Sequence, residues 1–166
     1  MNINKEKIKQ FIHYIIHKCE GKPNFGKTVL LKLMYFSDFN NYELYETQIT
    51  DETYIKRKWE PIPSHFDDIC EELKNEEKIE SKQVPVITHD RNWHYSLKEP
   101  DTLLLSKNEL EVIDDVLDNL SNMTAAEISE YSHGDKPWRV AKFHETLDPE
   151  FVFYRNEKYS VRDYND

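Results

Sequence analysis

The sequence predicts an α+β domain that is mainly helical, with a central buried helix and a small β-hairpin or sheet element. Three observations lead to this class. Residues 27–42 are apolar on nearly every side at helical spacing, several flanking segments carry apolar residues on one helical face, and only short segments between them alternate. The 166 residues are about the size of one domain, so we expect 1–166 to fold as a unit.

The first predicted helix precedes a phosphate-loop-like string. Ile8, Phe11, Ile12, Ile15 and Ile16 recur at helical spacing and are followed by "GKPNFGKT", which fits G-x-x-x-x-G-K-[ST]. A phosphate-binding loop needs a buried strand before it, and no later apolar run ends in the Asp that would hold Mg²⁺. We therefore predict that Gly21 ends the first helix and that 21–28 binds no nucleotide.

The second helix is predicted over about 27–42 and should be the central one, because a helix that is apolar all round is buried. Its apolar residues are Val29, Leu30, Leu31, Leu33, Met34, Tyr35, Phe36, Phe39 and Tyr42.

An extended segment is predicted near 52–59, ended by Pro61 and Pro63. Ser64 and Asp67 resemble a capping box for a helix over about 65–77. "KQVPVITHDRNWHYSLK" predicts a β-hairpin with its turn at 89–92. Its two arms carry Val84, Val86 and Ile87, and Trp93, Tyr95 and Leu97.

Capping boxes mark the helices that follow. Ser106 with Glu109 predicts a helix over 107–120, and Thr124 with Glu127 predicts one to about Tyr131. Asp135 can cap a last helix over about 136–145. "FVFYRNEKYSV" is consistent with a final small hairpin.

The net charge limits the kinds of partner that the chain can bind. The formal charge is −10, of which residues 101–166 contribute −8. Nucleic acid is therefore not the expected direct partner, because phosphate binding needs a basic surface. No signal peptide and no membrane-length apolar run is visible, and two distant cysteines suggest reduced thiols in a cytoplasmic protein.

The candidates for catalysis or metal binding are weak. His13 and His17 have metal-ligand spacing but no H-E-x-x-H pattern, so we expect two histidines on the polar face of a surface helix. His133, Asp135 and Lys136 beside Trp138 could form an acid–base cluster, although a helix cap with an aromatic anchor is simpler. His89 and His94 are expected to be solvated, and we predict no catalytic residue, metal or cofactor.

Two features are candidates for partner binding. Tyr54 and Trp59 lie in an extended segment, where aromatic side chains either pin the segment to the helices or form a contact surface. An acidic stripe on the 107–120 helix is either a solvated face or a docking surface for a basic partner. Its residues are Glu111, Asp114, Asp115 and Asp118.

Three stretches in the same order resemble one family. "KLMYFSDF" (32–39) resembles the K-L-L-Y-F-A-D signature of the SocA-like, or Panacea, antitoxin domain, also met as the phage-associated GepA type. "WEPIPSHFDDICEEL" (59–73) resembles its Y-G-P-V-P-S segment and following helix. Residues 105–138 resemble its closing run, which ends in Thr-His and then Pro-Trp.

The chain departs from the family pattern at two places. Trp59-Glu60 replaces Tyr-Gly, which removes a permissive backbone position, and Ser132-His133 replaces Thr-His. The N-terminal DNA-binding part that often accompanies the family is not expected here.

The resemblance implies a binding role rather than an enzyme. Such proteins are antitoxins of two-gene toxin–antitoxin modules, often of prophage, that neutralise a toxin protein by contact. In some members the antitoxin is a proteolytic adaptor that delivers the toxin to an AAA+ protease. A hydrolase centred on His133 is the alternative from another class.

Overall fold

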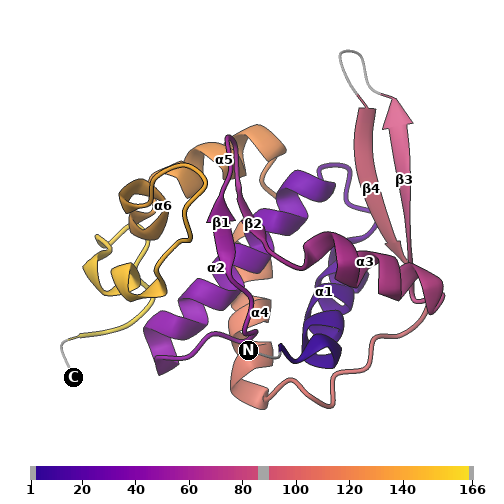
Figure 1. Ribbon diagram of the computed structural model, residues 1–166, viewed down its shortest axis with the longest axis horizontal. Coiled ribbons are helices and arrows are strands. Elements are labelled where there is room, and N and C mark those ends of the chain that lie inside the picture. Colours follow the sequence, from indigo (N-terminus) through magenta and orange to yellow (C-terminus); the bar gives the residue numbers. More distant parts are fainter. Residues whose placement is uncertain (1–2, 86–89, 165–166) are drawn as a thin grey trace.

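A computed structural model describes residues 3–85 and 90–164. The fold is a mainly helical α+β arrangement in which helix α2 (Lys27–Tyr45) runs through the middle (Figure 1). The earlier helix α1 (Lys5–Cys19) and α4 (Lys107–Leu120) pack against it, as does α5 (Ala125–His133). The central position of α2 confirms the expectation from its all-round apolar sequence, and Leu30, Leu33 and Phe39 are fully buried in the core.

The string at 21–28 joins two helices, as predicted. The helix α1 ends at Cys19, and Gly21 adopts the left-handed backbone conformation at φ +86°. The chain therefore enters this turn from a helix and not from a strand, and Gly26 then directly precedes α2. The geometry of a phosphate-binding loop is therefore absent from this described part of the chain.

Two separate antiparallel hairpins supply the β-structure. Strand β1 (Tyr54–Lys56) pairs with β2 (Pro61–Pro63), so the two prolines lie within a strand instead of ending one. Proline is tolerated there because β2 pairs with only one neighbour and half of its N–H groups need no partner. The second hairpin, β3 (Ile79–Pro85) with β4 (Asp90–Ser96), projects from the helical body (Figure 1).

The second hairpin was predicted at the right place, but its turn lies earlier than expected. Pro85 pairs with Asp90, so the connection is 86–89 and not 89–92. Val86, Ile87 and His89 lie outside the described residues, and so does the side chain of Trp93.

Helix α3 (Phe66–Asn75) begins without the expected capping box. His65 is the residue before the helix, and the Ser64 hydroxyl donates to the Thr53 carbonyl, 2.7 Å away, instead of accepting from the helix. The Ser64 side chain, which the sequence pattern assigned to the helix cap, is thus used for a hydrogen bond to the backbone beside the first hairpin. The boxes at Ser106 and Thr124 do form as predicted.

The C-terminal part differs most from expectation. Helix α6 (Lys136–Val140) is shorter than predicted because Ala141 is extended and leads the chain alongside β1. The first four residues of the expected hairpin, 151–154, instead belong to a 3₁₀ helix, η1 (Pro149–Tyr154). Pro149 at its first position and an Asp148 side chain that accepts from the Glu150 N–H explain this start.

Candidate functional site

The residues of the three family-like stretches converge around the indole of Trp138. We call Lys32, Trp59, His133 and Trp138 the motif cluster. They come from α2, the β1–β2 turn, the end of α5 and α6 respectively. Trp138 is 6% exposed, which confirms the prediction that it is a buried anchor.

Lys32 is fully buried although it carries an ammonium group. Its Nζ donates to the Trp59 carbonyl at 2.9 Å and lies 5.4 Å from the centre of the Trp138 ring. Burial lowers the pKa of Lys32 to about 8, and nearby Glu60 only partly offsets this effect. Burial of a lysine ammonium costs free energy. Here the hydrogen bond to the carbonyl and the contact with the ring face offset part of that cost, and the same hydrogen bond holds the turn.

His133 binds the same carbonyl from the other side of the cluster. Its Nε2 lies 2.8 Å from the Trp59 oxygen, and because a carbonyl only accepts, Nε2 must carry the proton. The imidazole also stacks on Trp138, with ring centroids 4.9 Å apart and planes 13° apart. Two side chains distant in sequence therefore fix the backbone of the β1–β2 turn.

Lys56 completes the packing around Trp138. Its Nζ donates to the carbonyls of Trp138 at 2.8 Å and Ala141 at 3.0 Å, and lies 4.6 Å from the centre of the indole. Burial lowers the pKa of this lysine as well. The ammonium groups of Lys32 and Lys56 are thus directed to backbone carbonyls, an arrangement that holds loops in place.

Asp135 is engaged away from His133. Its carboxylate accepts from Arg155 Nη2 and from the Tyr35 hydroxyl, each at 2.7 Å. Arg155 also donates to Glu43 at 3.0 Å and to Asn40 at 2.8 Å, and the side chains of both ion-pair partners are fully buried. The structure does not bring His133 and Asp135 together as an acid–base pair.

The family follows from a comparison with known proteins. The model of a family described as antitoxin SocA-like, Panacea domain, matches residues 30–139, which include the whole motif cluster. The chain belongs to this family. Searches of curated proteins and of solved structures found no match to the chain.

Tyr54 of this Panacea domain lies in the core, and the expectation that it offers a contact surface needs correction. It is 1% exposed, and its hydroxyl donates to Asp38 at 2.6 Å. Asp38 also accepts from the Thr50 N–H at 2.8 Å and the Thr50 hydroxyl at 2.6 Å, and burial raises the pKa of Asp38 to about 7. Tyr54 therefore pins β1 to α2.

Trp59 is the exposed aromatic of the segment, with 65% of its surface accessible. The Lys58 ammonium lies 5.0 Å from the centre of its ring. All four residues of the acidic stripe on α4 are exposed too. Asp114 differs from the others because its carboxylate accepts from the Tyr14 hydroxyl at 2.6 Å and so helps to join α4 to α1.

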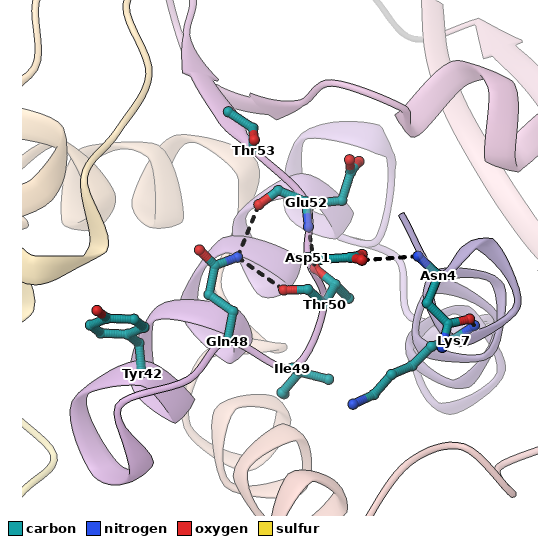
Figure 2. A pocket seen from close by; sticks show the side chains of 9 residues that line it. All are labelled: Asn4, Lys7, Tyr42, Gln48, Ile49, Thr50, Asp51, Glu52 and Thr53. Carbon is teal, nitrogen blue, oxygen red and sulfur yellow. Dashed lines mark hydrogen bonds between the residues drawn. The ribbon is translucent and has the colours of Figure 1, made fainter. Parts of the chain in front are cut away.

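The Panacea domain also has a polar cavity of about 550 Å³ between α1, the end of α2 and the segment before β1 (Figure 2). Asp51 accepts from the Asn4 N–H at 2.9 Å, and the Gln48 amide donates to the carbonyls of Thr50 and Glu52. These groups satisfy one another across the segment. The hydrogen bonds explain the shape of the loop.

Two histidine predictions were wrong about burial. His13 is 2% exposed and bonds Ser96 and the Lys98 carbonyl, because α1 packs against β4. His94 is 6% exposed, and burial lowers its pKa to about 4.

Among the described residues, no group of three His, Cys, Asp or Glu side chains could hold a metal ion, and no helix could span a membrane.

Sequence reasoning missed Lys32, Lys56, Glu43 and Arg155 as individual functional or structural residues. Lysine, glutamate and arginine are mostly exposed, so their types gave no signal of burial. The resemblance marked Lys32 as part of a signature, and that was the only sign of its special position.

Proposed function

We propose that this Panacea domain is an antitoxin that binds and neutralises a partner toxin protein. The family assignment over residues 30–139 is the observation that carries the proposal. A role in binding agrees with the motif cluster and the neighbouring Lys56, because Lys32, Lys56 and His133 hold backbone carbonyls around a buried indole.

Trp59 is the proposed centre of the contact surface. Binding energy in protein interfaces concentrates in a few large side chains, with Trp among the commonest. A binding residue also works better when it is pre-positioned, because less freedom is lost on association. The turn that carries Trp59 is fixed by Lys32 and His133, which supports this choice.

Exposed residues of the acidic stripe, Glu111, Asp114, Asp115 and Asp118, are proposed as a second region that contributes to docking. Charges at the rim of an interface chiefly change the association rate. We place this activity in the cytoplasm, which agrees with two buried free thiols, Cys19 and Cys70.

Co-expression tests the proposal. The reading frame adjacent to the gene is expressed from an inducible promoter, alone and together with this chain. We expect the product alone to stop growth, growth to resume with this chain, and the two proteins to purify as one complex. An adjacent product that remains toxic in the presence of the folded chain would refute the antitoxin role.

A further inference from the structure

Basic residues gather in two segments of an otherwise acidic chain. Residues 56–60 and 136–146 hold six Lys or Arg and two Glu, whereas the whole chain has a formal charge of −10. Four of the six, Arg57, Lys58, Arg139 and Lys142, are exposed.

The fold brings the two segments side by side. The Lys56 N–H donates to the Glu145 carbonyl at 2.9 Å, and the His144 N–H donates to the Lys56 carbonyl at 2.7 Å. Arg57 reaches the same turn, with its guanidinium 3.0 Å from His144 Nδ1. Figure 1 shows the chain after α6 passing beside β1.

Large apolar side chains lie among these charges. Trp59 is 65% exposed and Phe143 57% exposed. We call Arg57, Lys58, Trp59, Arg139, Lys142 and Phe143 the basic–aromatic tip. Phe143 is held by Lys56, whose ammonium lies 5.0 Å from the centre of the ring.

The positive charges of the tip are not held in ion pairs. Within the described residues, none of its four Lys and Arg side chains forms an ion pair within 4.0 Å of a carboxylate. The lysines Lys7 and Lys9 of α1, by contrast, each pair with glutamate. Unpaired charges around exposed aromatic rings are typical of a surface that meets the opposite charge on a partner.

We propose that the basic–aromatic tip docks an acidic segment of a partner protein that also presents an apolar side chain to Trp59 and Phe143. This inference rests on the proposed function and names the chemistry of the toxin surface. The apolar residue would supply most of the affinity, and the acidic residues would fix its position and speed association.

A protein segment fits the surface better than a nucleic acid does. The tip is small and belongs to a strongly acidic molecule, whose field would repel an extended phosphate backbone. A protein partner needs only about 800 Å² on each side, and its acidic residues can be confined to the area of the tip.

A labelled peptide tests the tip directly. The probe is a fluorescein-labelled 15-residue peptide of alternating Glu and Leu with one central Phe, and binding is followed by anisotropy at low and high salt. We expect saturable binding that weakens with salt. Trp59→Ala and the double variant Lys58→Glu, Lys142→Glu should each weaken it by about tenfold or more.

The matched control makes the same change in charge elsewhere. Lys18 and Lys107 are exposed on α1 and at the start of α4, so Lys18→Glu with Lys107→Glu should change the affinity by less than about threefold. Thermal melts verify that every variant is folded. Absence of peptide binding, or equal loss in the tip and control variants, would overturn the proposal.

Two further arms separate other outcomes. A 20-base-pair DNA duplex that binds the tip more tightly than the peptide does at the same salt would also overturn it. If the chain does not neutralise the adjacent product in co-expression, the antitoxin role is refuted, but the peptide assay still tests binding at the tip. Should neutralisation succeed equally well with Lys58→Glu, Lys142→Glu, the tip is not where the toxin docks.

Discussion

The acidic face of α4 and the basic–aromatic tip carry opposite charge and are built in different ways. The acidic face is a regular surface that needs only a capped helix with apolar residues on its other side. The tip consists of the β1–β2 turn and the end of α6 with the segment after it, and side chains from α2, α5 and β1 hold these parts. A charged surface on a helix is therefore local, whereas the tip depends on distant parts of the core.

The largest expected effect is the loss of stability when the ring beneath the tip is removed. Trp138→Ala removes the ring against which Lys32, Lys56 and His133 pack, and a buried Trp truncated to Ala costs about 3–5 kcal/mol. Urea denaturation followed by circular dichroism measures the loss. Leu103→Ala, at a side chain 88% exposed, is the control. A Trp138→Ala protein as resistant to urea as the parent would mean that the cluster does not depend on this ring.

The next effect tests whether a buried ammonium holds the turn. The pKa of Lys32 is about 8 in the folded chain and 10.5 in the unfolded chain, so the unfolded state binds more protons between these pH values. The free energy of unfolding should therefore rise from about pH 8 to pH 10.5, by at most about 3 kcal/mol.

Lys32→Met removes this titrating group and therefore serves as the reference for the parent protein. We expect the parent to gain stability relative to Lys32→Met over that range, as measured by urea denaturation at several pH values. Parallel pH profiles of the two proteins would contradict a buried, destabilised ammonium at this position.

A smaller effect separates binding from folding. Trp59→Ala should weaken toxin binding by about 2 kcal/mol, chiefly through faster dissociation, because the ring is an exposed anchor. The melting temperature should stay the same, in contrast to Trp138→Ala. Surface plasmon resonance with the purified toxin gives both rates. Normal binding by folded Trp59→Ala would place the anchor elsewhere.

The smallest effect concerns α4. Reversal of Asp115 and Asp118 to Lys leaves the Asp114–Tyr14 hydrogen bond intact and should slow toxin association by about tenfold or less. The dependence of the association rate on salt should also become flatter. An unchanged rate at low salt would show that α4 is only a solvated face.

The difference between the two regions also explains what the sequence could predict. α4 and its capping box were predicted to the residue, because every signal for them lies within fifteen consecutive positions. Trp59 was expected in an extended segment and lies in the turn that follows β1. Its support by Lys32 and His133 was not predicted, since those contacts span 27 and 74 residues. Tyr54 could be read either as pinned to the helices or as a contact residue, and the sequence did not decide between these because its partner Asp38 lies in another element.

The hairpin expected near the C-terminus failed for a similar reason. Its apolar and aromatic residues were compatible with strands, but the segment is placed by Arg155, which reaches Asp135 and Glu43 inside the core. A side chain that satisfies two buried carboxylates determines the local backbone more strongly than propensity does.

The ion pairs of Arg155 with Glu43 and Asp135 also affect when the core can form during synthesis. In synthesis Glu43 precedes Arg155 by 112 residues and Asp135 precedes it by 20, and until Arg155 follows, these carboxylates have no guanidinium to neutralise them. Leaving such a group without its partner costs about 3–5 kcal/mol, a large part of the stability of an ordinary domain. The nascent protein therefore completes its native core only after Arg155 has been translated and released from the exit tunnel.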